Sequence, residues 1–377
     1  MEKIKFLFVF GTRPEAIKLI SLIKLMSSEE KFLTKICVTG QHEQMLCQVL
    51  DFFEIKPDYN LKLMKSKQGL SNLTSDLIKA INIVIEKEFT PDYVIIQGDT
   101  TSGMVGALTA FYHQIKVIHV EAGLRSNNIK SPFPEEINRK IIADIADFHF
   151  CPSDKAFNNL IKEGINEKRI WNVGNTVIDS LKIGLNRLRN EKQYIYENKF
   201  RFIDKSKKLI LVTAHRRENL GDPLKNICCA LKRIVENSKN TEIVFPVHLN
   251  PKIREIVMKE LHNNLKIHLI DPLSYPELIW FLNNCTLVIT DSGGIQEEAP
   301  TLGKPVLVIR ETTERVEYVE SGNAKIVGTN SEKIVEQCLD LLNNEYSYQR
   351  MAKVNNFYGN GDSCEKIISI LKSKLEI

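Results

Sequence analysis

Residues 285–300, CTLVITDSGGIQEEAP, contain the transition that decides the fold. The apolar run CTLVI predicts a buried strand, and the paired glycines that follow predict the start of a helix. A strand, a Gly-rich turn and a helix in this order are typical of parallel α/β sheets. Backbone N–H groups at such a helix start attract anions, yet Glu297 and Glu298 follow within the first turns. The combination favours a ligand with two faces, one a phosphate and the other a sugar diol.

The same alternation of short β-rich runs and longer helical patterns extends over almost the whole chain. Strands are predicted at residues 4–10, 34–38, 93–97, 116–120, 148–151 and 170–173, and again at 209–213, 242–247, 266–270, 287–290, 306–309 and 325–327. Helices are predicted at residues 72–88, 224–237 and 252–261. Six strands twice over predict an α/β protein with two Rossmann-like domains, each built on a parallel sheet.

The chain length also favours two domains, because 377 residues exceed the size at which a single core usually keeps growing. We place the N-terminal domain at residues 1–177, a hinge at 178–208 and the C-terminal domain at 209–361. The hinge contains the charged stretch RLRNEKQYIYENKFRFIDKSKK and no apolar strand. The tail, residues 362–377, has the pattern of an amphipathic helix that can pack on either domain, the N-terminal one included.

The composition is that of an ordinary globular protein, with 43% hydrophobic and 26% charged residues. The net charge of +4 comes from interspersed acids and bases, which argues against a nucleic-acid partner. Eight cysteines without a CxxC pair indicate reduced thiols rather than disulfides or zinc. The N-terminal run MEKIKFLFVF leads directly into GTRPE and predicts a strand, not a signal peptide. No apolar stretch approaches the roughly 20 residues of a membrane span, so we expect a cytoplasmic protein.

Polar residues that directly follow predicted strands are the candidates for a site, because open parallel sheets bind ligands beyond the carboxyl ends of their strands. GTRPE follows the first strand, and Thr12 and Glu15 in it have the spacing of a capping box. Arg13 would add a guanidinium to this helix start, which suits a phosphate. A well-capped helix without a binding function explains the stretch equally well.

Two carboxylates, Asp99 in GDT and Glu121 in EAG, follow two further strands. A single acid there is often only the N-cap of the next helix. Two acids from strands of one sheet converge on one crevice, where repulsion raises one pKa and tunes an acid or base for neutral pH. In SPFPEEINR, Pro134 is expected to start a helix on which Glu135 and Arg139 share a face. A surface salt bridge is the alternative reading of that pair.

The second half of the chain offers groups that suit an anion. TAHRRE places His215, Arg216 and Arg217 after one strand, and FPVHLNP places His248 after another. A lone histidine is more often structural, but a histidine beside arginines at a strand end favours an anion site. One of the two arginines can be structural, because neighbouring side chains point in different directions.

The stretch TDSGG completes the candidate anion site. Ser292, Gly293 and Gly294 can present hydroxyl and amide donors to a diphosphate. Glu297 or Glu298 can accept from both ribose hydroxyls, although the helix dipole alone would also favour acids there. Arg315, beyond the strand at residues 306–309, can reach the same ligand.

Several common motifs are missing from the sequence. It has no GxxxxGK[ST] loop for ATP, no GxGxxG fingerprint for NAD and no HExxH or comparable metal spacing. We therefore expect no cofactor and no metal. Arginines, histidines, carboxylates and glycines at strand ends favour a nucleotide-diphosphate sugar handled by acid–base chemistry.

Taken together, the motifs are similar to those of a known family. GTRPEAIKL, TGQHEQM, QGDTTS, HVEAGLRS, PFPEEINR, VGNTVID, TAHRRENLG, FPVHLNP, TDSGGIQEEAPTLGKPVL and TERVE occur in this order between residue 6 and about residue 328. The chain resembles the bacterial non-hydrolysing UDP-N-acetylglucosamine 2-epimerases. The resemblance implies a glycosyltransferase-B-like arrangement with the active site in the interdomain cleft. It also implies reversible conversion of UDP-GlcNAc to UDP-ManNAc, by anti elimination of UDP to 2-acetamidoglucal and re-addition.

The resemblance assigns roles to individual residues. By similarity, the catalytic residues are Asp99, Glu121, Glu135, Arg139 and His215. The residues expected to bind UDP are Arg13, Lys18, Ser292, Gly293, Gly294, Glu298 and Arg315. The residues expected to bind a second, activating UDP-GlcNAc are Gln41, His42, Gln44, Lys67, Glu136, Arg216 and His248.

Two positions depart from the family pattern. Lys67 stands where an arginine is usual, and a lysine lacks the bidentate fork, so weaker activation is expected. Val316 stands where TERPE has a proline that would fix φ, so a looser loop around Arg315 is expected.

The resemblance also implies a homodimer that takes part in polysaccharide biosynthesis and has UDP-GlcNAc as its small-molecule partner. Three other functions compete with the epimerase. A hydrolysing relative would release ManNAc and UDP, but the complete activator set favours the non-hydrolysing type. A glycosyltransferase would need an acceptor site, and the paired acids argue against one. A non-catalytic UDP-sugar sensor is the third.

Overall fold

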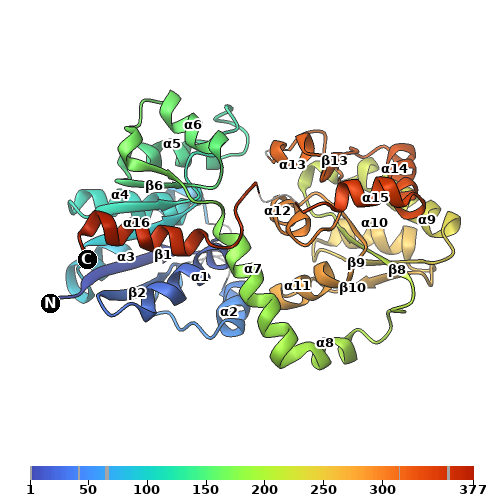
Figure 1. Ribbon diagram of the computed structural model, residues 1–377, viewed down its shortest axis with the longest axis horizontal. Helices are drawn as coiled ribbons and strands as arrows, with labels where there is room; N and C mark the ends of the chain where they lie inside the picture. Colours follow the sequence, from blue (N-terminus) through green and yellow to red (C-terminus); the bar gives the residue numbers. More distant parts are fainter. Residues whose placement is uncertain (1, 41–42, 64–67, 314, 355–356) are drawn as a thin grey trace. The chain divides into compact units, whose positions relative to one another are not determined.

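The computed structural model describes residues 2–40, 43–63, 68–313, 315–354 and 357–377. The chain forms two compact units, one containing residues 1–183 and 358–377, the other residues 184–357 (Figure 1). The stretch that we expected to be a hinge, 178–208, is helical over much of its length. Helix α7 (Thr176–Arg187) crosses the boundary between the units, and a π-helical turn (Leu188–Lys192) and α8 (Gln193–Lys199) follow it. The chain returns to the first unit at Tyr358, before the expected end of the second domain at residue 361.

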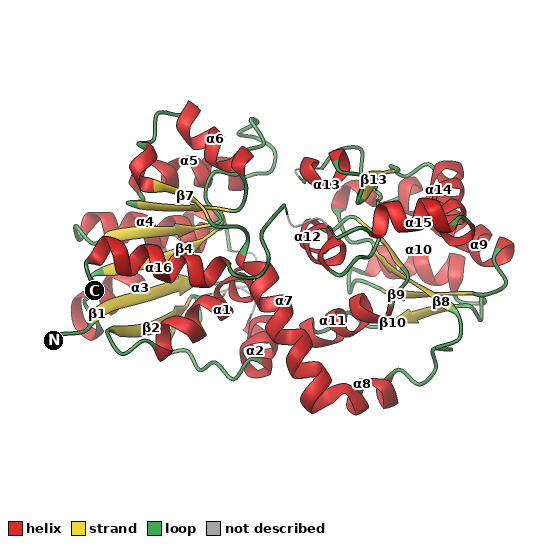
Figure 2. Ribbon diagram, in the orientation of Figure 1, coloured by secondary structure: helices red, strands yellow, loops and turns green. Residues whose placement is uncertain are grey.

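A parallel sheet forms the centre of the first unit (Figure 2). Its seven strands lie in the order β3-β2-β1-β4-β5-β6-β7. The strands are β1 (Ile4–Phe10), β2 (Phe32–Val38), β3 (Tyr59–Asn60), β4 (Tyr93–Gln97), β5 (Lys116–Val120), β6 (Phe148–Cys151) and β7 (Ile170–Asn172). Six of them lie where the sequence predicts strands. The expectation of six strands in this domain was wrong, because the sheet also contains β3. The two residues of β3 are too few to produce a recognisable period-2 pattern in the sequence.

Helices flank this sheet, and their ends follow local signals. They are α1 (Arg13–Ser28), α2 (Glu43–Phe52), α3 (Leu70–Ile83) with a π-helical turn (Val84–Glu88), α4 (Thr101–Tyr112), α5 (Glu135–Ile145), α6 (Asp154–Lys162) and α16 (Ser363–Leu375). The predicted capping box of α1 is confirmed: the Glu15 N–H donates to Thr12 Oγ1, and the Thr12 N–H donates to Glu15 Oε2. The C-terminal α16 packs on α1, and its Lys372 forms an ion pair with Glu29 at 2.6 Å.

The second unit has a six-stranded parallel sheet in the order β10-β9-β8-β11-β12-β13. Its strands are β8 (Lys208–Thr213), β9 (Thr241–Pro246), β10 (Ile267–Ile270), β11 (Leu287–Thr290), β12 (Val306–Val308) and β13 (Ala324–Ile326). Its helices after α8 are α9 (Asp222–Asn237), α10 (Pro251–Leu261), α11 (Tyr275–Asn284), α12 (Gly293–Thr301), α13 (Val316–Glu320), α14 (Ser331–Asn343) and α15 (Glu345–Ala352). In both sheets the strand order reverses beside the first strand, between β1 and β4 and between β8 and β11. Such a switch point is where open sheets bind ligands.

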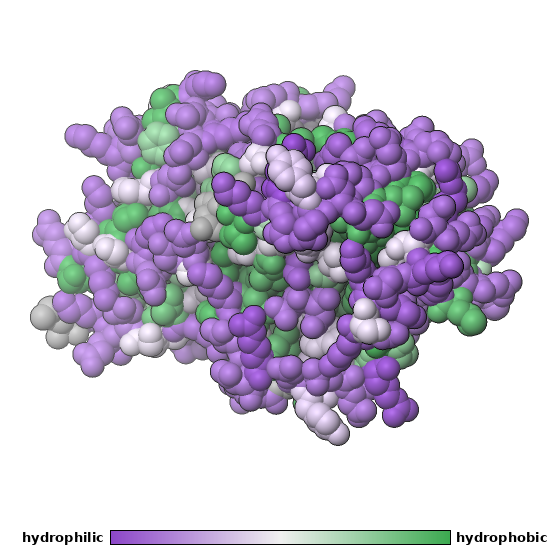
Figure 3. Space-filling model, turned by 45° about the vertical axis from the view of Figure 1, so that its right-hand side comes forward, coloured by the Kyte–Doolittle hydropathy of each residue, from purple (hydrophilic) through white to green (hydrophobic). Residues whose placement is uncertain are grey.

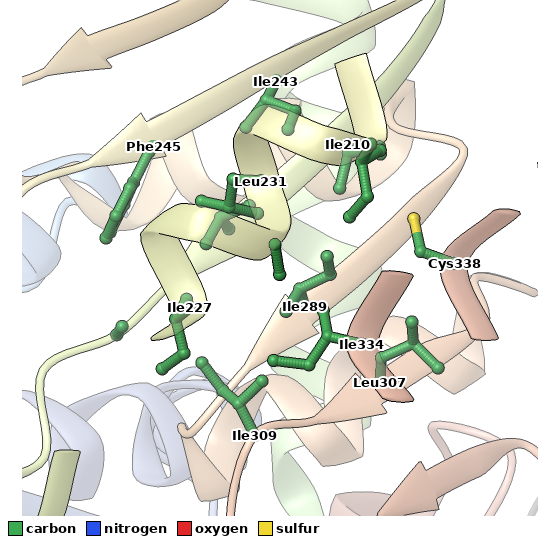
Figure 4. Packing of buried hydrophobic residues seen from close by; sticks show 14 of the residues in the cluster. Ile210, Ile227, Leu231, Ile243, Phe245, Ile289, Leu307, Ile309, Ile334 and Cys338 are labelled. Atoms are coloured by element: carbon green, nitrogen blue, oxygen red, sulfur yellow. The ribbon is translucent and has the colours of Figure 1, made fainter. Parts of the chain in front are cut away.

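Aliphatic side chains from both helices and strands close the core of the second unit. Ile227 and Leu231 of α9 and Ile334 and Cys338 of α14 converge on Ile289 and its neighbours in the sheet (Figure 4). All of these side chains are fully buried. Every residue of this core cluster lies between residues 210 and 351, so the unit carries a core of its own.

Hydrophilic residues cover most of the face of the molecule in Figure 3, and hydrophobic ones form scattered spots on it. None of the described helices has the length and apolar content that crossing a bilayer requires. All eight cysteines are free, six of them buried, while Cys47 and Cys229 are exposed. Burial raises the pKa of the Cys37 and Cys285 thiols to about 12, so these thiols are inert.

Candidate functional site

The carboxyl ends of β1, β4 and β5 gather the predicted acids of the first unit. Glu121 follows β5 directly and is 8% exposed. Its carboxylate accepts hydrogen bonds from the ammonium of Lys18 and the amide of Gln97, and a third from Asn175 Nδ2 at 3.0 Å. Its backbone φ is 65°, a conformation that side-chain-bearing residues seldom adopt. A buried carboxylate that is hydrogen-bonded by side chains from several segments and lies in a strained backbone is characteristic of a functional position.

Asp99 follows β4 and forms an ion pair with Arg139 of α5. The carboxylate Oδ2 lies 2.6 Å from Arg139 Nη2 and 2.8 Å from Nε. Asn138, also on α5, donates to the Asp99 carbonyl at 2.9 Å. Burial alone would lower the pKa of Arg139, but Asp99 and Glu136 outweigh it and raise that pKa. Asp99 and Glu121 thus each face a cation of their own, which opposes the repulsion expected between them.

Glu135 and Arg139 do not form the i, i+4 salt bridge that was the alternative reading of their spacing. Arg139 instead pairs with Asp99 and with Glu136, whose Oε2 lies 2.8 Å from Arg139 Nη1. Glu135 is the first residue of α5, and its Oε2 is buried without a hydrogen-bond partner in the described structure. A buried carboxylate oxygen without a donor can receive a ligand.

Glu136, an expected activator contact, is fully buried. Its carboxylate accepts from the Ser126 and Asn127 N–H groups at 2.9 and 3.0 Å, in addition to Arg139. Burial raises its pKa, but these donors outweigh burial and hold the pKa below its ordinary value. The carboxylate therefore fastens the loop before α5, whichever ligand binds there.

Glu15 links the turn before Arg13 to the turn after Asp99 through hydrogen bonds. Its Oε2 accepts from the Gly11 and Thr12 N–H groups at 3.0 and 2.7 Å, and its Oε1 accepts from Thr100 Oγ1 at 2.6 Å. The side chain is fully buried, and burial raises its pKa despite these donors. Arg13 begins α1 directly after the capping residue, so its position is set by this turn.

A buried histidine supports the turn before Asp99. His119 is 1% exposed, and burial lowers its pKa to about 4. The ring is therefore neutral at physiological pH. Its Nε2 lies 2.8 Å from the Gly98 carbonyl oxygen, so Nε2 carries the proton and donates.

In the second unit, Asp291 organises the loop that follows β8. Its Oδ2 accepts from the His215 and Arg216 N–H groups at 2.8 and 2.9 Å, and from Asn219 Nδ2 at 2.9 Å. Its Oδ1 lies 2.9 Å from His215 Nδ1. Burial would raise the pKa of Asp291, but His215 and the backbone donors outweigh it and lower that pKa. The Arg216 side chain donates from Nε to the Asp291 carbonyl oxygen at 2.9 Å.

The start of α12 is open and faces a guanidinium. Ser292 is the N-cap residue, and its hydroxyl makes no capping hydrogen bond. A Cβ placed on Gly293 would lie 3.3 Å from Arg315 Cζ, whereas one on Gly294 would have no atom within 4 Å. Glu297 holds Arg315 there, with Oε1 2.8 Å from Nη2 and 2.9 Å from Nε. Free N–H groups beside a guanidinium form an anion site at a helix start.

Glu298 and His248 occupy other positions around this helix start and the loop after β8. Glu298 is buried and accepts from the Tyr275 hydroxyl at 2.8 Å. The His248 and His215 rings have centroids 6.3 Å apart and planes 20° apart. Burial and the neighbouring His215 lower the pKa of His248.

Four predicted activator contacts lie outside the described part of the chain. These are Gln41, His42 and Lys67, together with the side chain of Gln44. No group of His, Cys, Asp and Glu side chains that could hold a metal ion occurs in the residues that the structure covers.

The structure adds residues that the sequence reasoning missed. Gln97 and Asn175 hold Glu121, and Asp291 holds His215. Glu297, which the sequence offered as an acceptor for the ribose, holds Arg315. Gln97, Asn175 and Asp291 lie at or just beyond strands, inside motifs already noted, so the strand-end rule applied to every polar residue would have found them. Their partners are not evident from sequence, because each contact joins segments far apart in the chain.

Comparison with known proteins gives one consistent family. The family model described as UDP-N-acetylglucosamine 2-epimerase matches residues 24–372. A UDP-N-acetylglucosamine 2-epimerase from Campylobacter jejuni is 48% identical over 373 residues, covering 97% of both chains. One from Escherichia coli K12 is 45% identical over 375 residues, covering 98% of both chains. The crystal structure of the UDP-GlcNAc 2-epimerase from Neisseria meningitidis bound to UDP-GlcNAc matches with a TM-score of 0.93 and 42% identity. That match covers 98% of this chain and 100% of the other, so the fold similarity extends over both units.

Proposed function

This chain belongs to the UDP-N-acetylglucosamine 2-epimerase family, and from that premise we propose that it interconverts UDP-GlcNAc and UDP-ManNAc by inverting C2 of the sugar. The observation that carries the proposal within the structure is the carboxylate of Glu121, buried at a strand end and held by Lys18, Gln97 and Asn175. A buried, hydrogen-bonded carboxylate of this kind is suited to proton transfer, which supports the proposal. The enzyme is accordingly an isomerase.

The chemistry of C2 dictates the reaction route. No carbonyl adjoins C2 in the pyranose, so its hydrogen is only weakly acidic and direct deprotonation is difficult. In anti elimination, a base takes the C2 proton, the electron pair forms the C1–C2 double bond, and the C1–O bond to UDP breaks. A proton then reaches C2 from the opposite face, and UDP re-adds at C1. The elimination and re-addition together are redox-neutral, so the reaction requires no redox cofactor.

We assign the proton transfers to the acids of the first unit, Asp99, Glu121 and Glu135. Inversion needs groups on both faces of C2, and these three come from different elements: the ends of β4 and β5 and the start of α5. The partnerless Oε2 of Glu135 and the three-donor clamp of Glu121 support this assignment. Arg139 holds Asp99 in place through two of its nitrogen atoms.

We assign UDP binding chiefly to the second unit. The N–H groups of Gly293 and Gly294, the Ser292 hydroxyl and the Arg315 guanidinium suit the diphosphate. Glu298, one turn into α12, suits the two ribose hydroxyls. His215, Arg13 and Lys18 would stabilise the negative charge on the departing diphosphate. Departure of UDP accounts for much of the activation barrier, because the C2 hydrogen is only weakly acidic.

The direct test is incubation with UDP-GlcNAc in D2O. We expect deuterium at C2 of the recovered sugar nucleotides and accumulation of UDP-ManNAc, both followed by NMR. Absence of label at C2 under turnover would eliminate the proposed mechanism. Irreversible release of UDP and free ManNAc in the same sample would instead identify the hydrolysing type.

We further propose that a second UDP-GlcNAc activates the enzyme. Of the expected contacts, Arg216 and His248 lie around the loop after β8, and Glu136 fastens the loop before α5. Initial rates should depend sigmoidally on UDP-GlcNAc concentration, and the reverse reaction of pure UDP-ManNAc should accelerate when a trace of UDP-GlcNAc is added. Hyperbolic kinetics in both directions would remove the activator from the proposal.

The homodimer and the role in cytoplasmic polysaccharide biosynthesis are also part of the proposal, because they follow from the resemblance. Light scattering at micromolar concentration should give twice the 43.2 kDa chain mass. A monomer mass would contradict the dimer without affecting the proposed reaction.

A further inference from the structure

We propose that Asp291 is a positioning residue for His215, fixing the imidazole with Nδ1–H toward the buried carboxylate and Nε2 toward the ligand. This inference rests on the proposed function, because the ligand in question is the diphosphate of the sugar nucleotide. It adds to the site a residue that neither the motif reasoning nor the resemblance assigned.

The two oxygens of Asp291 have different tasks. Oδ2 accepts three hydrogen bonds, from two backbone N–H groups and from Asn219 Nδ2. Oδ1 is buried and has no hydrogen-bond partner in the described structure apart from the His215 ring, whose Nδ1 lies 2.9 Å away. One oxygen therefore holds the loop, and the other is left for the imidazole.

The hydrogen-bonding capacity of a carboxylate determines the tautomer of the ring. Because a carboxylate only accepts, the nitrogen facing it must carry a proton. With Nδ1–H committed to Asp291, Nε2 is the ring nitrogen left for a ligand. It donates to a phosphate oxygen when the ring is protonated and accepts a proton when the ring is neutral. The His215 side chain is 44% exposed, so the ring can reach a bound molecule.

Arg216 and His248 lie beside the ring. The nearest acid on the same loop, Glu218, pairs with Arg310 at 2.9 Å. Arg216 lies on the same loop, and its Nε is directed to the Asp291 carbonyl oxygen. His248 faces the ring from the segment after β9, and its lowered pKa favours the neutral form. Asp291 Oδ1 lies within hydrogen-bond distance of His215 Nδ1, whereas the His248 ring centroid is 6.3 Å from that of His215, so the orientation of His215 depends on the carboxylate.

The substitution Asp291→Asn separates the two tasks. An amide has one carbonyl oxygen, and the three donors at the Oδ2 position hold that oxygen there. The NH2 group then faces His215 Nδ1 and forces the proton onto Nε2. The loop contacts survive the change, whereas the tautomer reverses. A carboxylate that served only to hold the loop would make this substitution nearly silent.

The experiment combines NMR of 15N-histidine-labelled protein with steady-state kinetics. The His215 resonance is assigned with His215→Asn. We expect the Nδ1–H tautomer in the wild type and the Nε2–H tautomer in Asp291→Asn. We also expect kcat to fall roughly 100-fold, the scale for losing a preorganised group, with KM for UDP-GlcNAc nearly unchanged.

Thr213→Val is the matched control, because it removes the 2.6 Å hydrogen bond between the Thr213 and Thr290 hydroxyls at the same strand ends. It leaves the Asp291 carboxylate contacts unchanged, since in the described structure Thr213 meets Asp291 through its backbone carbonyl alone. It should keep the wild-type tautomer and kcat within a few-fold. An Nε2–H tautomer in the wild type, or unchanged tautomer and kcat in Asp291→Asn, would overturn the inference. If Asp291→Asn does not fold, the wild-type tautomer decides alone. A wild type that lacks epimerase activity but has the Nδ1–H tautomer would contradict the proposed function and leave the positioning intact.

Discussion

At the scale of single residues, Glu121 combines a strained backbone conformation with a carboxylate that is hydrogen-bonded by neighbouring side chains. A non-glycine residue at φ 65° carries a penalty of about 1–3 kcal/mol, and such strain persists only where surrounding contacts enforce it. Here the contacts are the ammonium of Lys18 and the amides of Gln97 and Asn175. The carboxylate is therefore held in place before any substrate arrives.

We predict that Glu121→Gln lowers kcat at least roughly 100-fold, because general acid–base groups typically contribute that much or more. KM should change little, since the substituted amide keeps the size of the side chain. Steady-state epimerisation assays measure both constants. Glu332→Gln, an exposed acid paired with Arg233, is the control and should leave kcat unchanged. Full activity in Glu121→Gln would remove Glu121 from the proton transfers.

His149 predicts a pH dependence of stability. Burial, reinforced by the neighbouring His119, lowers its pKa to about 3, whereas the unfolded chain protonates this residue near its ordinary value of about 6.5. Between these values the unfolded state binds more protons, so stability falls as pH falls. At pH 5 the loss from this one residue amounts to about 2 kcal/mol relative to neutral pH.

His149→Leu should therefore lose less stability between pH 7.5 and pH 5 than the wild type, as measured by urea unfolding. The exposed His262→Gln serves as the control and should retain the wild-type dependence. Identical pH dependence in His149→Leu and the wild type would show that His149 does not titrate on unfolding in this range.

At the scale of elements, the start of α12 depends on a side chain from another segment. Arg315 precedes α13, and Glu297 within α12 holds its guanidinium against Gly293. The helix start thus carries the partial charge of its own N–H groups and a full charge from the guanidinium. The neighbouring α13 begins at Val316, directly after this arginine.

We predict that Glu297→Gln weakens UDP binding by roughly tenfold, about 1.4 kcal/mol, because Arg315 loses its charged anchor. Isothermal titration with UDP measures the change. Glu320→Gln at the exposed end of α13 is the control and should bind as the wild type does. Unchanged affinity in Glu297→Gln would mean that UDP binding does not depend on the ion pair between Glu297 and Arg315.

The junction of α7 and the returning chain is a second element-scale feature. Gly174, with φ +89°, lies so close to the returning segment that a Cβ would sit 2.7 Å from both Tyr358 O and Ser363 Oγ. Its neighbour Asn175 donates from its backbone N–H to Tyr358 O at 2.6 Å, while its side chain binds Glu121. Asn175 therefore both binds the returning C-terminal segment and positions the Glu121 carboxylate.

Gly174→Ala should destabilise the first unit by about 2 kcal/mol more than Gly164→Ala, because both positions need positive φ but only Gly174 has neighbours to clash with. The chain has two tryptophans, so Trp280→Phe leaves Trp171 as the reporter of the first unit in urea unfolding. Equal losses of unfolding free energy in Gly174→Ala and Gly164→Ala would mean that the segment at Tyr358 and Ser363 shifts to accommodate the added methyl group at little cost.

At the scale of the whole molecule, the two units differ in continuity. The second unit is a single stretch, residues 184–357, with a closed core. The first unit needs residues 358–377, since α16 packs on α1 and the Cys364 N–H donates to Asp179 Oδ1 at 2.9 Å. Burial of Asp179 also raises the pKa of its carboxyl group.

We predict that residues 184–357 alone unfold cooperatively in urea and bind UDP, whereas residues 1–183 alone do not unfold cooperatively. Joining residues 1–183 to 358–377 through a short Gly-rich linker should restore cooperative unfolding of the first unit. Circular dichroism and UDP titration follow the three proteins. Cooperative unfolding of residues 1–183 without α16 would show that the C-terminal helix is dispensable.

The sequence by itself determined the parallel two-domain fold, the position of twelve strands, the capping box of α1 and the strand ends that carry the candidate site. These features follow from periodicity, turn residues and caps, which are short-range properties of a chain. It also placed Glu135 and Arg139 on one helix face. The alternative reading of that spacing, a salt bridge between them, does not occur, because Arg139 pairs with Asp99 and Glu136.

Only the tertiary structure decided which side chains meet. One partner of Glu121, Asn175, lies 54 residues away in the chain, and the partner of His215 is Asp291. The C-terminal helix α16 belongs to the first unit. The two-residue strand β3 is likewise stabilised by pairing with β2 and not by its own sequence. Contacts of this kind depend on the spatial order of the strands in the sheet. A local sequence pattern does not specify which strand lies next to another, so it does not specify these contacts.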